Sequence, residues 1–249
     1  AGIHTLDTAP AYENCEEILG DHLNGKSEFK IISKTPVEIE PDNVEQEFIN
    51  SLQRLGVEKL YGYLVHLYLA YTKNNGIWSE LRKLKDKGQV EKIGFSLYSP
   101  FELEDIFEKK LRPDFVSVPY NIFDRRFERL FSRAKDQGIG IHIRSIFLQG
   151  LFFMTEEEVS VKFTKETANK LSQLKILCSK TNISIAALCL NFGLLNDDIE
   201  RVIIGIDNEQ QLLDNIEYLN YSSKVGELIN ELDAYKIDDE NVILPYKWN

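Results

Sequence analysis

The sequence predicts an α/β protein with the architecture of a (β/α)8 barrel of the TIM type. Short apolar runs alternate along the chain with amphipathic segments whose apolar residues are three or four positions apart. Runs that are apolar on both faces are typical of parallel strands covered by helices, and regular strand–helix alternation is typical of doubly wound sheets and barrels. Polar residues end several of the runs, at the rim where barrel enzymes have their active sites.

The elements are predicted in order from this pattern. The predicted strands are Ile3–Asp7, Phe29–Lys34, Tyr61–His66, Lys92–Ser96, Phe115–Val118, Ile139–Arg144 and Arg201–Gly205. The predicted helices are Glu16–Leu23, Val44–Leu55, Ile77–Lys87, Phe101–Phe107, Phe127–Gln137, Lys165–Thr181, Ser184–Leu195, Asn208–Tyr218 and Lys224–Tyr235. The strands are one fewer than a closed barrel needs, so we expect a first strand and helix to be missing from the sequence as given. No linker rich in Pro, Gly or Ser interrupts the pattern, which predicts a single domain over residues 1–249.

The amino-acid composition limits the kinds of partner and the cellular location that we expect for the protein. The chain has 29 basic and 40 acidic side chains and a net charge of −11, which disfavours nucleic acid and anionic membranes as partners. No apolar stretch is long enough to span a bilayer, and no signal peptide is visible. Cys15, Cys178 and Cys189 are too few and too scattered for a disulfide framework or a zinc site, so we expect reduced thiols and a cytoplasmic protein. The oligomeric state is left open.

Four polar residues form the candidate catalytic group. Asp7, Lys34 and His66 each end a predicted strand, and Tyr12 follows Asp7 in the loop TAPAY. Because side chains alternate between the faces of a strand, all three strand residues can point into the barrel at its top rim. A metal-dependent hydrolase or isomerase is one rival interpretation, but such a site needs several converging ligands, and His4 should point outward if Asp7 points inward.

The chemistry of these residue types predicts carbonyl reduction. Asp7 and Lys34 are costly at the ends of apolar strands unless they pair with each other. A lysine ammonium beside the hydroxyl of Tyr12 stabilises its phenolate, so the tyrosine can give a proton to a carbonyl oxygen as a general acid. His66 can donate a hydrogen bond to the same oxygen. No side chain supplies a hydride, so a nicotinamide cofactor is implied. Each residue alone has an ordinary structural explanation; their order and spacing together favour catalysis.

The segment GIHTLDTAPAY, followed by CEEILG, resembles the signature of the aldo-keto reductases, and IISKTP and LVHL stand where that family has its lysine and histidine strands. The stretches KGQVEKIGFSLYSP, VPYNIFDRR, IRSIFLQGLF and VIIGIDNEQQLLDNI also follow in the family's order. The resemblance implies a barrel with the dinucleotide extended across its top. It also implies that Asp7, Tyr12, Lys34 and His66 are the catalytic tetrad.

The resemblance also implies cofactor-binding residues. The positions that hold the nicotinamide carboxamide fall on Ser96, Leu97 and Ser117, and the last two depart from the family. Ser117 can still form a hydrogen bond but reaches less far than the family's glutamine, and Leu97 offers no side-chain hydrogen bond. Further positions near the cofactor are Arg144, Gly205, Asp207, Gln211, Asp214 and Asn215. The family favours NADP, whereas an acidic residue such as Asp207 suits the free ribose hydroxyl of NAD. The sequence therefore predicts NADP, with NAD as the alternative.

The substrate is expected to be a small aldehyde or ketone, and a sugar-derived carbonyl is our hypothesis. Phe147, Phe152 and Phe153 are candidates for the mouth of the pocket, and Tyr68 and Trp78 are candidates for its walls, although packing explains Trp78 better. The alternative function is a non-catalytic nicotinamide-binding sensor or partner protein on the same scaffold. The filled tetrad positions favour the enzyme.

Overall fold

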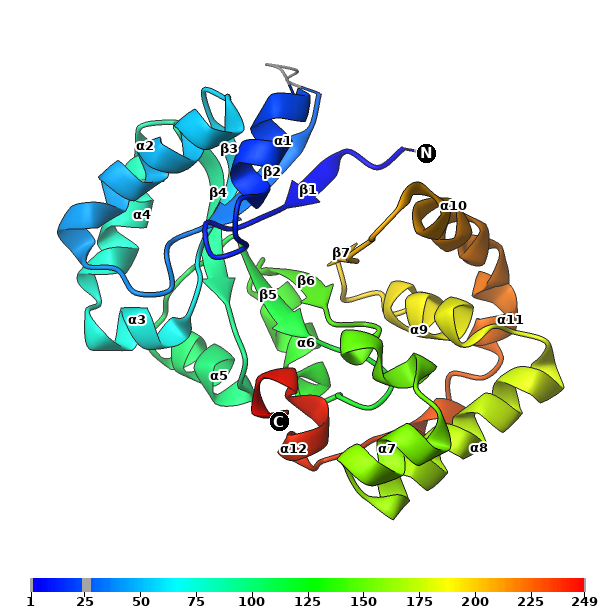
Figure 1. The fold of residues 1–249 in the computed structure, drawn as a ribbon. Coiled ribbons are helices and arrows are strands. Elements are labelled where there is room, and N and C mark those ends of the chain that lie inside the picture. Colours follow the sequence, from blue (N-terminus) through cyan, green and yellow to red (C-terminus); the bar gives the residue numbers. More distant parts are fainter. Residues whose placement is uncertain (1, 24–27, 249) are drawn as a thin grey trace. The chain divides into compact units, whose positions relative to one another are not determined.

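The computed structural model describes residues 2–23 and 28–248, so the end residues of the predicted domain, Ala1 and Asn249, lie outside it (Figure 1). Its residues group into two compact units. The first unit contains residues 1–117 and 134–140, and the second contains residues 118–133 and 141–249. The single domain over residues 1–249 stays a prediction.

The strands confirm the predicted fold class. They are β1 (Thr5–Asp7), β2 (Lys30–Lys34), β3 (Leu60–Val65), β4 (Val90–Ser96), β5 (Phe115–Pro119), β6 (Gly140–Arg144) and β7 (Arg201–Val202). The sheet has seven strands in chain order, and helices connect them, which fits a (β/α)8 barrel of the TIM type. All the predicted strands are present, and the last is shorter than predicted because Ile203–Gly205 continue as a loop.

Buried parallel strands and helices build the first unit. Its helices are α1 (Cys15–Leu23), α2 (Val44–Leu55), α3 (Tyr68–Lys73), α4 (Gly76–Asp86) and α5 (Pro100–Glu108), with a short 3-10 turn at Pro41–Asn43. Every residue of β3 is buried, as expected for a parallel strand covered on both faces. The register pairs Asp7 with Ile32 and Lys34 with Leu64, so the carboxyl ends of β1, β2 and β3 lie side by side.

Local sequence signals explain several boundaries in this unit. The apolar residues of α2 include Val44, Phe48 and Leu55, which are all buried, and the helix ends at Gly56, whose φ of 63° is left-handed. Helix α5 begins with a capping box in which the side chain of Ser99 caps the first turn and that of Glu102 returns to the backbone of Ser99. Trp78 stacks on Phe95 with ring centroids 4.7 Å apart, so its role is core packing and not a pocket wall.

The second unit carries the later helices. They are α7 (Glu156–Lys162), α8 (Lys165–Thr181), α9 (Ile185–Leu194), α10 (Glu209–Tyr218), α11 (Ser222–Gly226) and α12 (Glu240–Ile243), while α6 (Glu128–Asp136) begins in this unit and ends in the first. Short 3-10 segments cover Leu148–Phe153, Leu219–Tyr221, Glu231–Tyr235 and Pro245–Lys247. Helix α7 lies beside α8, and α9 lies beside α10 (Figure 1).

One predicted helix is wrong, and several short helices were missed. The predicted Lys224–Tyr235 is divided into α11, which ends at Gly226, and the 3-10 segment Glu231–Tyr235. Glycine is a poor helix residue, and apolar spacing alone cannot show that the chain changes direction there. The missed helices α3, α7 and α12 have seven residues or fewer, which is too short for a periodic pattern to stand out.

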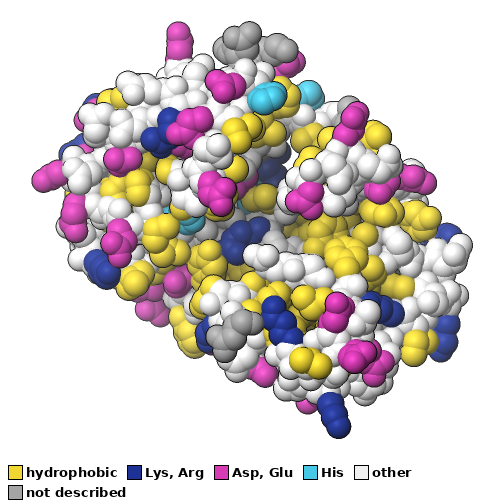
Figure 2. Space-filling model, viewed as in Figure 1, with side chains coloured by type: hydrophobic (Ala, Val, Ile, Leu, Met, Phe, Trp, Pro, Cys, Tyr) yellow, Lys and Arg dark blue, Asp and Glu magenta, His cyan; other side chains and the backbone are white. Residues whose placement is uncertain are grey.

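The surface agrees with the acidic composition. Acidic side chains are scattered over the visible face and do not form one patch (Figure 2). Within residues 2–23 and 28–248, no single helix has the length and apolar character to cross a membrane. Helices α8 and α9 meet those criteria only as a pair, and the chain bends by 94° between them.

Candidate active site and dinucleotide cavity

Lys34 and Asp7 form a buried ion pair at the carboxyl ends of β2 and β1. The Nζ atom of Lys34 lies 2.5 Å from Oδ1 of Asp7 and donates a second hydrogen bond, at 2.9 Å, to the carbonyl oxygen of Thr8. The side chains of Lys34 and Asp7 are only 2% and 12% exposed. The pairing that the strand pattern predicted is therefore present, and it places a cation at the rim of the sheet.

Tyr12 extends over this cation from the loop between β1 and α1. Two backbone hydrogen bonds shape the loop, from Tyr12 N to the Ala9 carbonyl and from Cys15 N to the Tyr12 carbonyl, each of 3.0 Å. The Nζ atom of Lys34 lies 4.8 Å from the centroid of the Tyr12 ring. The tyrosine itself is 41% exposed, so its face can reach a ligand while its ring is within the field of the ammonium.

His66 completes the group from the end of β3. Its ring centroid lies 6.0 Å from that of Tyr12, and the two planes meet at 88°. The residue is 6% exposed, and its backbone N–H donates to Oγ1 of Thr35, directly after Lys34. The structure therefore brings Asp7, Tyr12, Lys34 and His66 together within the first unit, from three neighbouring strand ends.

Sequence reasoning missed two residues of this site. Thr8 supplies the second acceptor for Lys34 through its backbone carbonyl, and Thr35 holds the backbone of His66. Both are buried. Their only signal in the sequence is that each directly follows a tetrad residue at a strand end.

The first unit also brings Ser96 and Ser117 together. They are partners in the register of β4 and β5, are 2% and 1% exposed, and the backbone N–H of Leu97 donates to the Ser117 carbonyl at 2.8 Å. Among the described residues, the hydroxyl of Ser117 and Oδ2 of Asp7 are buried polar atoms that have no hydrogen-bond partner within the protein. A buried polar atom without a partner is costly. Both atoms therefore suit a bound group that carries amide or hydroxyl functions.

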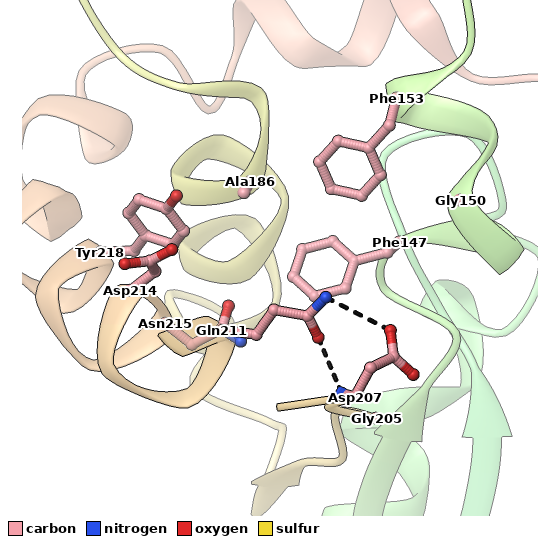
Figure 3. A pocket seen from close by; sticks show the side chains of 10 residues that line it. All are labelled: Phe147, Gly150, Phe153, Ala186, Gly205, Asp207, Gln211, Asp214, Asn215 and Tyr218. Carbon is pink, nitrogen blue, oxygen red and sulfur yellow. Dashed lines mark hydrogen bonds between the residues drawn. The ribbon is translucent and has the colours of Figure 1, made fainter. Parts of the chain in front are cut away.

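Five of the remaining predicted cofactor residues lie in the second unit, where they line a cavity of about 410 Å3 (Figure 3). Its lining contains the predicted residues Gly205, Asp207, Gln211, Asp214 and Asn215, together with Phe147, Gly150, Phe153, Ala186 and Tyr218. Figure 3 shows the rings of Phe147 and Phe153 on the opposite side of the cavity from helix α10. Aromatic faces opposite polar side chains suit a flat heterocycle that carries hydrogen-bonding groups.

Two residues of the cavity lining, Asp207 and Gln211, are hydrogen-bonded to each other. Gln211 accepts a hydrogen bond at Oε1 from the backbone N–H of Asp207 at 2.8 Å, and its Nε2 donates to Oδ2 of Asp207 at 3.3 Å (Figure 3). Asn208 caps α10 by accepting from the backbone N–H of Gln211. Among the described residues that line the cavity, none is basic. The lining is therefore acidic and neutral.

Three other residues predicted to lie near the cofactor or the substrate, Arg144, Phe152 and Tyr68, are not part of the cavity lining. Arg144 ends β6 and is half-buried, but it is not part of the cavity lining. Phe152 is fully buried and packs on Phe123 with ring centroids 4.7 Å apart, so it does not form a pocket mouth. Tyr68 is buried in the first unit and donates to Asp105 at 2.6 Å. Burial raises the pKa of Tyr68, and the hydrogen bond to Asp105 raises it further.

Three lining residues were not predicted, namely Gly150, Ala186 and Tyr218. Tyr218 lies one helical turn after Asp214 on α10, and Ala186 lies in the first turn of α9. The spacing between Asp214 and Tyr218 was a usable signal, because residues four apart share a helix face. Within residues 2–23 and 28–248, no group of three or more His, Cys, Asp or Glu side chains is arranged to hold a metal ion.

Comparison with known proteins gives the same result as the motifs. The model of the "Aldo/keto reductase family" matches residues 1–236. The chain belongs to the aldo-keto reductase family. This family uses nicotinamide cofactors and reduces small-molecule carbonyl compounds, so the chain is an oxidoreductase.

The curated relatives of this aldo-keto reductase are distant. The chain is 25% identical to the NADH-specific methylglyoxal reductase of Escherichia coli, over 88% of the chain and 79% of that protein. It is 22% identical to the pyridoxal 4-dehydrogenase of Microbacterium luteolum, over 89% of the chain and 81% of that protein. Among solved structures, the aldo-keto reductase AKR11C1 of Bacillus halodurans in its holo form superimposes with a TM-score of 0.78 at 19% identity, covering 96% of this chain and 85% of that one. A likeness at this identity supports the fold.

Proposed function

We propose that this aldo-keto reductase transfers a hydride from a reduced nicotinamide dinucleotide to a small aldehyde or ketone, with Tyr12 as the proton donor. The observation that carries the proposal is the group at the strand ends of the first unit, where the Lys34 ammonium is 4.8 Å from the centroid of the Tyr12 ring and the centroid of the His66 ring is 6.0 Å from it. A proton donor, a neighbouring cation and a hydrogen-bond donor are what carbonyl reduction needs from a protein.

The dinucleotide would supply the hydride, and residues of the chain would bind the dinucleotide. Ser96 and Ser117 are proposed to bind the nicotinamide carboxamide, because the Ser117 hydroxyl is buried without a partner among the described residues. The cavity lined by Gly205, Asp207 and Gln211 is proposed to hold the adenosine end, since it combines aromatic rings with polar groups. Arg144 is also proposed as a cofactor residue, and only its position at the end of β6 supports this.

In this mechanism each tetrad residue has one task. Tyr12 gives its hydroxyl proton to the carbonyl oxygen as negative charge develops there. Lys34 stabilises the phenolate that remains, and Asp7 holds the ammonium in place through their ion pair. His66 orients the carbonyl oxygen by a hydrogen bond, which also lowers the energy of the developing charge.

For the dinucleotide, two arguments point in different directions. The resemblance to the family predicted NADP, but the cavity lining has the carboxylates of Asp207 and Asp214 and no basic side chain among its described residues. A 2′-phosphate beside a carboxylate is repelled, whereas a free ribose hydroxyl can donate a hydrogen bond to it. The lining therefore favours NADH, and NADPH is the alternative.

The proposed substrate is a small carbonyl compound with neighbouring oxygen functions, such as a sugar-derived aldehyde. The names of two relatives support this class, since one from Escherichia coli is a methylglyoxal reductase and one from Arabidopsis thaliana is an L-galactose dehydrogenase. We also propose that the protein is located in the cytoplasm.

The direct test is fluorescence titration with NADH and with NADPH, followed by turnover of methylglyoxal and of short aldoses. We expect binding of at least one dinucleotide and its carbonyl-dependent oxidation. Binding without turnover of any carbonyl would instead support the non-catalytic sensor, and binding of neither would contradict both functions.

A further inference from the structure

The carboxylate of Glu16, in the first turn of α1, is a buried charge that joins three elements. The residue is 1% exposed. Its Oε1 accepts a hydrogen bond of 2.5 Å from the hydroxyl of Ser33 in β2. Its Oε2 accepts from Ser51 at 3.2 Å and from Nε of Arg54 at 2.7 Å, both in α2. One oxygen therefore faces the strand and the other faces the neighbouring helix.

This carboxylate is connected through the chain to two residues of the proposed mechanism. Ser33 directly precedes Lys34, and Glu16 comes four residues after Tyr12. The backbone between Tyr12 and Glu16 is short and hydrogen-bonded, from Cys15 N to the Tyr12 carbonyl at 3.0 Å. A displacement of Glu16 would therefore displace the loop that carries Tyr12. The side chain of Tyr12 is 41% exposed, so packing covers it only in part.

Helix packing alone does not require the bond to Ser33. Helix α1 already approaches α2 very closely at Gly20, where a Cβ atom would come within 2.1 Å of the Arg54 carbonyl oxygen. Arg54 and Ser51 bind the Glu16 side chain from that same helix. The bond to Ser33 ties α1 to the strand carrying Lys34. Charge-assisted hydrogen bonds of this kind are short and directional.

We infer that Glu16 is a positioning residue, whose hydrogen bond with Ser33 fixes the Tyr12 loop against the strand that carries Lys34. This inference rests on the proposed function for its kinetic consequence. Through this bond, the distance between the Tyr12 ring and the Lys34 ammonium is set by the fold before any ligand binds. The Glu16–Ser33 hydrogen bond therefore supports turnover, whereas the Glu16–Ser51 hydrogen bond contributes only to the stability of the fold.

The test compares two matched variants, Ser33→Ala and Ser51→Ala. Both serines are fully buried, and each loses one hydrogen bond to the same carboxylate. The readouts are the melting temperature, the dissociation constant for NADH, kcat, and the 19F spectrum of protein that contains fluorotyrosine. The chain has 11 tyrosines, so the Tyr12 resonance is assigned by its loss in Tyr12→Phe.

We expect Ser33→Ala to shift or broaden the Tyr12 resonance and to lower kcat by about tenfold, because small misplacements of a catalytic group are costly. Ser51→Ala should lower the melting temperature without either change. The dissociation constant for NADH should be unchanged in both variants.

Two results would overturn the inference. One is a Tyr12 resonance that Ser33→Ala leaves in place; the other is equal losses of kcat in both variants, in proportion to their losses of melting temperature. If the wild-type protein turns over no carbonyl, the proposed function fails, and the resonance of Tyr12 still decides whether Glu16 positions it.

Discussion

The ammonium of Lys34 lies 2.5 Å from the carboxylate of Asp7, in a setting where both side chains are almost fully shielded from solvent. A buried ion pair contributes little net stability compared with apolar residues of the same size, because both charges lose their hydration. Its presence at the ends of two strands therefore indicates a role for the charge itself. We propose that in this aldo-keto reductase the role is to hold a cation beside Tyr12, whose ring centroid lies 4.8 Å from the Lys34 ammonium.

Removing one member of the pair should be costly. Lys34→Met leaves Asp7 charged and buried, and we expect a loss of roughly 3–5 kcal/mol of unfolding free energy, measured by urea denaturation. Turnover should also fall, since Tyr12 loses its neighbouring cation. The double variant Asp7→Leu with Lys34→Met should recover much of the stability but none of the turnover.

The exposed pair Lys59–Glu91 provides the control, with side chains 64% and 51% exposed and a separation of 3.3 Å. Lys59→Met should cost less than about 1 kcal/mol. Lys34→Met and Lys59→Met could instead lower the unfolding free energy equally. That result would contradict the burial of the Lys34–Asp7 pair that the structure shows.

Asp207 is expected to determine the preference between the dinucleotides. Asp207→Asn removes the carboxylate from the cavity lining and leaves the side chain the same size. The affinity for NADPH should rise by about tenfold, which corresponds to ~1.4 kcal/mol of removed repulsion, while the affinity for NADH should change little. Fluorescence titration of both dinucleotides measures the two effects.

Asp214 lines the same cavity and accepts a hydrogen bond from Gln210 at 2.8 Å, so Asp214→Asn is the matched control for a change of charge. A gain in NADPH affinity from Asp214→Asn that equals the gain from Asp207→Asn would show that overall charge, and not the position of Asp207, sets the preference.

Asp105 should give the first unit a measurable acid dependence. Burial acts to raise the pKa of Asp105, but hydrogen bonds from Lys109 and Tyr68 outweigh it, and the pKa is lowered. A carboxylate whose pKa is lower in the folded state stabilises the fold above its unfolded pKa, and this contribution is lost as the pH falls through the folded pKa. Asp105→Asn should therefore destabilise the protein at neutral pH, by less than about 1 kcal/mol because the group is partly exposed.

The measurement is the unfolding free energy of both proteins from neutral to strongly acidic pH. The difference between wild type and Asp105→Asn should shrink as the solution becomes more acidic and vanish once the carboxyl is protonated in both states. A difference that is constant with pH would mean that the charge of Asp105 is not what stabilises the contact.

The three cysteines should differ sharply in reactivity. Cys15 is exposed, whereas Cys178 and Cys189 are buried. Burial raises the pKa of the Cys178 thiol to about 11 and raises that of Cys189 well above its ordinary value. Because the thiolate is the reactive form, iodoacetamide at neutral pH should label Cys15 alone in the folded protein and all three after denaturation, as mass spectrometry would show. Rapid labelling of Cys178 in folded protein would contradict its burial.

The sequence predicted much of this structure because its signals are local. The predicted α2 and α8 match the observed helices residue for residue, since both have clear apolar periodicity. The alternation of side chains along β1 and β2 was enough to predict the pair between Asp7 and Lys34. The grouping of Asp207 and Gln211 followed from the family resemblance.

Other features depend on tertiary contacts that no local pattern records. The bonds of Glu16 to Ser33 and Arg54 join residues 17 and 38 positions apart in the chain. A turn at Leu148–Gly150 was expected, but Leu148 and Gln149 do not usually favour positive φ, so the sequence did not indicate their φ angles of 45° and 51°.

The central claim is that Tyr12 is the proton donor in a dinucleotide-dependent carbonyl reduction, and one measurement tests it most directly. The measurement is single-turnover oxidation of bound NADH by methylglyoxal in Tyr12→Phe and in wild-type protein, each at saturating dinucleotide. Loss of the hydroxyl should slow hydride transfer by at least about 100-fold while the dissociation constant for NADH stays the same. A Tyr12→Phe protein that oxidises NADH at nearly the wild-type rate would contradict the assignment of the proton donor and, with it, the proposed mechanism.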